Sequence, residues 1–293
     1  MTIAASQVKE LREATGLGMM ICKKALTEAD GDMQKAIENL RKQGQSTAQK
    51  RAGKAANEGK VSIISANGTG LIYEVNSETD FVARNEDFIA FSGELGTILA
   101  ENKPADMTAA MAITSPAWGD QSVEGKLTEL IGKIGEKITF RRFTIVEIDA
   151  TKQCLASYIH GNGKIGVLVT LSVDKPEAIQ SEQLAELGKE LAMQIAAANP
   201  VDVDRERIPQ DVVAKEKEIY LTHAQSSGRP EKVWERIVEG KLSKYFREVA
   251  LLEQEYIRDT DLTVTQRISQ TEKELGTKIS VDSFVRYALG AEQ

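Results

Sequence analysis

Few residues of this chain could carry out chemistry, and the nearest to a reactive set are two carboxylates and a histidine. Glu78 and Asp80 stand two positions apart in Ser77-Glu78-Thr79-Asp80-Phe81, and His160 lies far along the chain. Such groups could serve as general acid and base if the fold brought them together. No basic or substrate-pocket pattern accompanies them. An acid–base enzyme therefore ranks third among the hypotheses for this protein, after the two binding functions described below.

Other reactive chemistry lacks its usual sequence patterns. Neither GxxxxGK[ST] nor GxGxxG follows a predicted strand, and the glycines at positions 68, 70, 161 and 163 fall in predicted hairpin turns. The two histidines and two cysteines have no spacing typical of a metal site, a disulfide framework or a nucleophile with its base. We therefore expect a protein that is not an enzyme, holds no metal or cofactor, and binds no nucleotide directly.

The same acidic stretch lies between a predicted strand at residues 71–75 and a helix that begins near Asp87, which leaves two hypotheses for its aromatic residue. In the first, Thr79 or Asp80 caps the helix and Phe81 packs into the core as a hydrophobic staple. In the second, Phe81 projects from the surface and contacts a partner. Residue types alone favour the staple.

Composition limits the class of protein and of partner. The chain is 41% hydrophobic and 28% charged, as is typical of a soluble globular protein. Its net charge of -7 opposes the binding of nucleic acid, so we do not expect that partner. We see no secretory signal and no apolar stretch long enough to cross a membrane, and the sparse cysteines suit a reducing compartment, so we expect a cytoplasmic protein.

Two amino-terminal segments precede the main body of the chain. Residues 1–43 predict three short helices, broken at residues 15–18 and 30–32, which could bury only a small core. Residues 44–60 are polar and predict a solvated, partly helical linker. An RNA-contacting arm is the alternative, although no aromatic residues interleave with its basic side chains.

The main body reads as two copies of one α+β unit, at residues 61–150 and 151–293. Each copy begins with a hairpin signal, at Asn67-Gly68 and at Gly161-Asn162-Gly163, followed by a helix and a further strand. Ile134-Gly135-Glu136-Lys137-Ile138 recurs as Leu275-Gly276-Thr277-Lys278-Ile279. The pattern predicts two antiparallel three-stranded sheets, each with helices.

The second copy carries an insertion at about residues 209–250 that predicts an antiparallel helical hairpin. Trp234, Val238, Leu242, Tyr245 and Val249 form a stripe on its second helix, and Val212, Ile219 and Ala224 are expected to face that stripe. The hairpin could be an arm that contacts a partner or a simple packing addition.

Two long stretches of the sequence resemble the elongation factor Ts family. Val8-Lys9-Glu10-Leu11-Arg12-Glu13-Ala14-Thr15-Gly16-Leu17-Gly18-Met19-Met20 looks like its amino-terminal signature, and Glu74-Val75-Asn76-Ser77-Glu78-Thr79-Asp80-Phe81-Val82-Ala83 looks like its second. A region from His160 to Val169 resembles a third, so the likeness covers nearly the whole chain. It implies a ubiquitin-associated-like helical domain, a duplicated α+β core and a coiled-coil hairpin.

The resemblance also implies a function and a partner. The family exchanges guanine nucleotide on the GTPase elongation factor Tu, which it binds in the GDP-bound and nucleotide-free states. Thr79, Asp80, Phe81 and Val82 match the segment that dislodges the bound Mg²⁺ of the GTPase. Further partner contacts are implied for the residues that match other family positions, Leu11, Met19, Met20 and His160. Ile21 departs from the acidic residue common in the family, so contacts there are expected to differ.

The second copy helps to decide between the two hypotheses for Phe81. Val173-Asp174-Lys175-Pro176 follows the corresponding strand and has no aromatic residue at that corner. The fold therefore does not require a staple there, and with the family signature we predict an exposed Phe81 beside a capping Thr79. The competing function, a non-catalytic adaptor that uses only the helical domain for protein recognition, would leave Asp80 and Phe81 unexplained.

Overall fold

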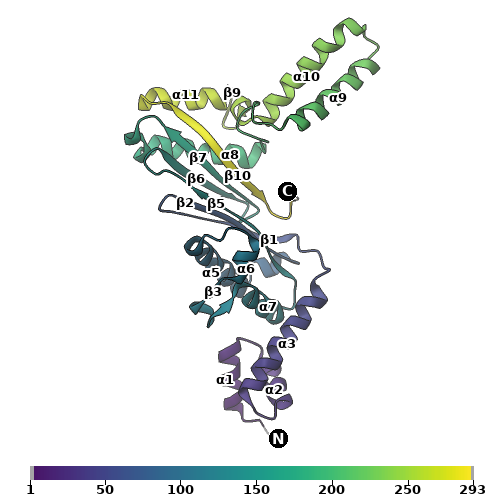
Figure 1. Cartoon of the computed structure of the whole chain (residues 1–293), viewed down its shortest axis with the longest axis vertical. Helices are drawn as coiled ribbons and strands as arrows, with labels where there is room; N and C mark the ends of the chain where they lie inside the picture. The colour runs from purple at the N-terminus through teal and green to yellow at the C-terminus, as the bar shows by residue number, and fades with distance from the viewer. Residues whose placement is uncertain (1–2, 292–293) are drawn as a thin grey trace. The chain divides into compact units, whose positions relative to one another are not determined.

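The computed structural model describes residues 3–291 and shows an α+β protein, with helices at the amino end followed by three-stranded sheets with helices (Figure 1). The chain divides into two compact units. The first holds the residues up to Ser62, then Tyr73–Phe143 and the segment from Leu289; the second holds Ile63–Ile72 and Thr144–Ala288. The expected domain limits at residues 1 and 293 lie outside the described part of the chain.

Three helices open the chain, as the sequence predicts: α1 (Ala5–Thr15), α2 (Met19–Glu28) and α3 (Met33–Arg51). Gly16 ends α1 with φ +66°, a conformation that favours glycine, and the Asp32 side chain caps α3 by accepting from Lys35 N at 3.0 Å. The helices enclose a small apolar core of their own: Val8, Leu11, Cys22, Ala25, Leu26, Ala29, Ala36 and Leu40.

Helix α3 is longer than the sequence analysis expected. The predicted linker began at residue 44, but the helix runs through Arg51 and β1 begins at Glu58. The extension has a packing partner, because Gly44 is buried against helix α7 (Val123–Ile134). A Cβ added to Gly132 would lie 2.8 Å from the Cα of Gly44, so the two helix backbones approach closely at this crossing.

The first sheet has the strand order β1-β2-β5, formed by β1 (Glu58–Ala66), β2 (Thr69–Ser77) and β5 (Ile138–Glu147). Between β2 and β5 the chain forms α4 (Asp80–Ala83), α5 (Glu86–Asn102), α6 (Met107–Ala112) and α7. A small sheet of β3 (Thr114–Ser115) and β4 (Gln121–Ser122) flanks the short helix η1 (Pro116–Trp118). Apolar residues of α5, including Phe88, Leu95 and Leu99, are fully buried. The predicted helices near 87–102 and 124–134 are therefore confirmed, whereas α4 was not predicted.

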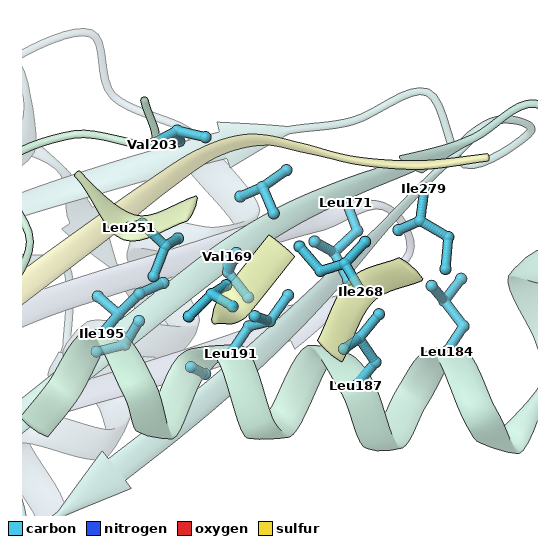
Figure 2. Close-up of a cluster of buried hydrophobic side chains, with 14 of the residues drawn as sticks. Val169, Leu171, Leu184, Leu187, Leu191, Ile195, Val203, Leu251, Ile268 and Ile279 are labelled. Carbon is cyan, nitrogen blue, oxygen red and sulfur yellow. The ribbon is translucent and has the colours of Figure 1, made fainter. Parts of the chain in front are cut away.

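The second sheet repeats this arrangement in the order β10-β7-β6, with β6 (Gln153–His160), β7 (Ile165–Val173) and β10 (Ile279–Ala288) all antiparallel. Helix α8 (Glu182–Ala198) packs along β6 and β7, and α11 (Val264–Leu275) packs on α8. Figure 2 shows the core between them, in which leucines of α8 point toward strand residues such as Val169 and Leu171. Short elements complete the unit: η2 (Pro176–Gln180), η4 (Leu251–Glu253), β8 (Glu255–Tyr256) and β9 (Asp259–Thr263).

The predicted insertion forms α9 (Gln210–Ser226), η3 (Glu231–Val233) and α10 (Trp234–Val249), and α9 and α10 lie against each other (Figure 1). Val238 and Ala224 are buried as expected. The expected inward position of Ile219 is wrong, because that side chain is 48% exposed. Its neighbour Tyr220 faces α10 instead, with the ring centre 5.5 Å from Lys241 Nζ. The predicted inward face of α9 therefore holds at Ala224, but Tyr220 takes the place expected for Ile219.

Among the described residues, none of the helices has both the length and the apolar character needed to cross a membrane.

Candidate functional site

The Thr79–Val82 segment forms a single helical turn at the corner between β2 and α5. Thr79 has extended backbone and caps α4, and its side chain accepts a hydrogen bond from Val82 N at 3.4 Å. Asn85 caps α5 in turn by accepting from Asp87 N at 2.9 Å. Both caps use short polar side chains whose oxygen satisfies a free amide at a helix start. Thr79 therefore has the capping role predicted for it.

Phe81 points into solvent from this turn. Its side chain is 80% exposed, whereas Val82 and Ala83 beside it are 8% and 7% exposed. The staple hypothesis is wrong, because a staple would place the ring in the core. An aromatic ring left in solvent would gain apolar burial if a partner covered it, so Phe81 is a candidate contact residue.

Asp80 is partly exposed and paired with an arginine that the sequence analysis did not single out. Arg84 donates to Asp80 Oδ2 at 2.9 Å, across one turn of the chain, and both side chains face water. An exposed pair of this kind adds little to stability because water and salt screen it. The i, i+4 spacing was the available signal for it. A partner could therefore separate this pair at little energetic cost.

The base of the segment is held by charged groups from distant parts of the sequence. Glu136 accepts from Thr79 N at 3.1 Å and from Thr79 Oγ1 at 3.0 Å. Glu78 accepts from Lys137 N at 2.7 Å and from Arg51 Nη1 at 3.2 Å. Hydrogen bonds to an ionised carboxylate are stronger than neutral ones. Phe81 is thus carried on a corner that is fixed before any partner arrives.

Methionines stand exposed at the start of α2. Met19, Met20 and Ile21 are 57%, 74% and 42% exposed, which makes a short apolar surface directly after Gly18. Leu11, by contrast, is fully buried in the core of the three helices. The structure gives Leu11 a packing role, and its implied contact with a partner stays a prediction.

The start of α2 lies beside the Thr79–Val82 segment. A shallow hollow of about 450 Å³ is lined by Gly16 and Gly18 on one side and by Phe81 and Val82 on the other. Lys133 also lines it and forms an ion pair with Asp87, with 2.7 Å between Nζ and Oδ1. Two of the predicted contact regions, from separate sequence signatures, therefore form one neighbourhood within the first unit.

His160 belongs to the second unit, at the end of β6. It is exposed, and its Nδ1 lies 3.0 Å from the hydroxyl of Tyr158, with the two rings tilted toward each other. Glu78, which the enzyme hypothesis would use as an acid or base, is engaged by a backbone amide and an arginine. Within residues 3–291, no cluster of His, Cys, Asp and Glu side chains could hold a metal ion.

The comparisons with known proteins agree with the sequence signatures. Residues 78–291 match the family model described as Elongation factor TS. The chain is 47% identical over 290 residues to Elongation factor Ts of Syntrophotalea carbinolica, covering 99% of this chain and 94% of that protein. It is 46% identical to Elongation factor Ts of Clostridium botulinum, strain Alaska E43, covering 98% and 93% of the two chains. It is 45% identical to Elongation factor Ts of Prosthecochloris aestuarii, covering 99% of each.

Proposed function

The chain belongs to the elongation factor Ts family, and we propose how its residues promote nucleotide exchange on elongation factor Tu. As a member it is a nucleotide exchange factor of translation elongation and not an enzyme. Exchange makes or breaks no covalent bond. What must be explained is how binding of one protein weakens the hold of another on GDP.

The Thr79–Val82 segment is proposed as the element that displaces Mg²⁺ from the GTPase. The observation that carries this proposal is the ring of Phe81, 80% exposed on a corner whose base is fixed by carboxylates. Mg²⁺ bridges nucleotide phosphates and protein groups, so a shift of its ligands weakens GDP binding. A ring inserted between packed elements can cause such a shift, because protein interiors move between discrete arrangements.

The four residues of the segment divide this work. Asp80 and Phe81 face the partner, Thr79 caps the turn, and buried Val82 anchors the turn to the core. Asp80 would exchange its exposed pairing with Arg84 for groups of the GTPase. Thr79 and Val82 thus act through the position they give to Phe81.

The remaining implied contacts are proposed to supply affinity. Met19 and Met20 suit a docking surface because the unbranched thioether side chain adapts to irregular partners. His160 is proposed as a second, separate contact, since it is exposed at a strand end. Leu11 supports the helices that present the two methionines.

At the level of domains we propose the division that the sequence suggested. Residues 1–43 are proposed as a ubiquitin-associated-like helical domain, and 61–150 and 151–293 as two related copies. Residues 44–60 are proposed as the connection to the core, of which the part up to Arg51 continues helix α3. The matching strand orders and helix positions of the two sheets support the duplication. The pair α9 and α10 is proposed as a coiled-coil arm of about residues 209–250 that reaches a partner.

The protein is proposed to act in the cytoplasm on elongation factor Tu, both GDP-bound and nucleotide-free. Linkage requires that a factor which weakens GDP binding is itself bound more weakly when nucleotide is present, so incoming GTP releases it. The adaptor hypothesis requires only the three helices and leaves the exposed Phe81 without a role.

Release of a fluorescent GDP from elongation factor Tu tests the proposal. We expect micromolar amounts of this protein to accelerate release many-fold at millimolar Mg²⁺. When a chelator removes Mg²⁺, spontaneous release rises and the acceleration by the factor shrinks, because its proposed target is already gone. No acceleration at millimolar Mg²⁺ would refute the exchange function. Acceleration that is equally large after chelation would refute the Mg²⁺ step alone.

A further inference from the structure

Glu136 lies outside the three stretches that resemble the family, yet its carboxylate is bound to the start of the Thr79–Val82 segment. We infer that Glu136 is a positioning residue for nucleotide exchange: it holds Thr79 so that the following turn presents Phe81 in one orientation. The inference rests on the proposed function of Phe81 and adds the residue that fixes its geometry.

The contact between Glu136 and Thr79 is extensive for one residue pair. Thr79 N donates to Oε2 at 3.1 Å, and Thr79 Oγ1 lies 3.0 Å from Oε1 and 3.1 Å from Oε2. The carboxylate therefore engages both the backbone and the side chain of Thr79. The same hydroxyl oxygen accepts from Val82 N, so Glu136 also orients the cap of α4.

Helix α4 needs this support from outside. It has four residues, and a single turn fixes many dihedral angles for one or two hydrogen bonds, so it is unstable alone. Phe81 cannot anchor the turn because its ring is exposed. The turn is held at one end by buried Val82 and Ala83 and at the other by the carboxylate of Glu136.

Glu136 is itself firmly placed. It follows Gly135, which ends α7 with φ +82° and donates its amide to Ile131 O at 2.8 Å. The next residue, Lys137, donates its amide to Glu78 at 2.7 Å and its ammonium to Ala52 O and Lys54 O at 2.8 Å. The turn at 135–137 therefore joins the end of α7, the end of α3 and the corner that carries Phe81.

In the second α+β copy, Thr277 stands at the position that corresponds to Glu136, and the corner there carries no exposed aromatic residue. Thr277 follows Gly276 as Glu136 follows Gly135, and its Oγ1 accepts from Lys175 N at 3.0 Å. At that corner the side-chain acceptor is a single neutral hydroxyl oxygen, and a backbone bond from Asp174 N to Lys278 O at 3.2 Å joins the same two segments. Corner closure is thus common to both copies, whereas a two-oxygen, charged acceptor stands at the corner that presents Phe81.

A consequence for exchange follows from the order of events. The methionine surface makes its contacts on docking, whereas Phe81 must insert when Mg²⁺ is displaced. If the turn that carries Phe81 is loosened, the free-energy cost of ordering it arises only when Phe81 inserts. The GDP-release rate at saturating factor should therefore fall, whereas the half-saturating concentration of factor should change little. This split separates positioning from a general loss of stability.

The test compares Glu136→Ala, Glu136→Gln and the matched control Thr277→Ala in release of fluorescent GDP from elongation factor Tu. Glu136→Ala is expected to lower the release rate at saturating factor about tenfold, with half-saturation changed less than about twofold. Glu136→Gln keeps one acceptor oxygen and is expected to recover part of the rate. Thr277→Ala removes the side-chain acceptor at the corresponding corner of the second copy and is expected to lower the melting temperature but leave the rate unchanged.

Hydrogen exchange of the peptide that spans residues 78–84, in the free factor, supplies a direct readout. It is expected to quicken in Glu136→Ala and to stay unchanged in Thr277→Ala. Wild-type saturating rates in a folded Glu136→Ala protein would overturn the inference while leaving the exchange function intact. Equal rate losses in Glu136→Ala and Thr277→Ala would also overturn it, as destabilisation alone would explain both. Failure of the wild-type protein to accelerate release would instead refute the proposed function.

Discussion

At the scale of single residues, the site consists of exposed apolar side chains set on polar anchors. Phe81, Met19 and Met20 are the apolar part, and each is more than half exposed. Thr79 caps the turn, and Glu136 and Glu78 hold its base. An exposed ring contributes little to folding, so its burial on a partner is available to drive a change in that partner.

The methionine surface allows a prediction about affinity. Replacing Met19 and Met20 together with serine is expected to raise the half-saturating concentration in GDP release about tenfold or more, since apolar surface is no longer buried on docking. The rate at saturation and the melting temperature should stay close to wild type. Ile89→Ser, which changes a 44% exposed side chain on α5, is the control. It should leave the half-saturating concentration, the rate at saturation and the melting temperature unchanged. A lowered saturating rate with unchanged half-saturation would contradict the assigned docking role.

Cys154 allows a prediction about pH. Burial, together with repulsion from Asp282, raises the pKa of the Cys154 thiol to about 11. The thiolate is the reactive form, so alkylation of the native protein should be slow at pH 8 and rise between pH 9 and 11. The raised pKa stabilises the fold below the ordinary thiol pKa, and this contribution is lost as pH rises toward 11.

Mass spectrometry of the alkylated native protein checks the Cys154 prediction. Cys22, fully buried among the three helices, should label more slowly still at neutral pH. Labelling of Cys154 at pH 8 at the rate of an exposed thiol would show that the side chain is not shielded as the structure has it.

At the scale of elements, close backbone contact sets the crossing of α3 and α7. Gly132→Ala places a Cβ 2.8 Å from the Cα of Gly44, where only backbone can yield. We expect it to destabilise the protein by about 1–3 kcal/mol, as overpacking does. Gly93→Ala is the matched control, because nothing lies within 4 Å of its added Cβ and alanine favours the helix.

Chemical denaturation of the two glycine variants measures this difference directly. The midpoint of Gly132→Ala should fall, and that of Gly93→Ala should stay level or rise. Equal midpoints for the two variants would mean that α3 and α7 do not cross at these glycines.

Elements also show where sequence reasoning succeeded and where it could not. The hairpins and the helices near 87–102, 124–134 and 183–199 follow from local turn signals and apolar periodicity, and the structure has them. The exposure of Phe81 could not be read locally, because a staple and a projecting ring share one sequence pattern. Only the second copy and the family signature distinguished them.

Other features were missed because their causes are distant in the sequence. The contacts of Glu136 with Thr79 and of Glu78 with Lys137 join residues that are far apart in the sequence. No local spacing pattern predicts such contacts. Helix α3 extends beyond its predicted end because Gly44 packs on Gly132 of α7. Ile219 and Tyr220 are adjacent on α9, so the sequence pattern allows either one to face α10, and in the structure it is Tyr220.

At the scale of the whole molecule, the residues proposed for exchange lie in separate parts of one acidic chain with a net charge of -7. The first unit carries the Thr79–Val82 segment and the methionine surface; the second carries His160 and the helices α9 and α10. Under the proposed function, several separate contacts would allow tight binding to the nucleotide-free GTPase, and the Thr79–Val82 segment would oppose Mg²⁺ and GDP. Linkage between the two ligands then makes the factor recyclable.

The central claim is that the exposed ring of Phe81 links docking to GDP release. The most direct measurement is the rate of fluorescent GDP release from elongation factor Tu at saturating wild-type protein and at saturating Phe81→Ala. We predict that Phe81→Ala lowers this rate at least about tenfold, while its melting temperature stays nearly that of wild type because the ring is not part of the core. An unchanged release rate in a folded Phe81→Ala protein would contradict the claim.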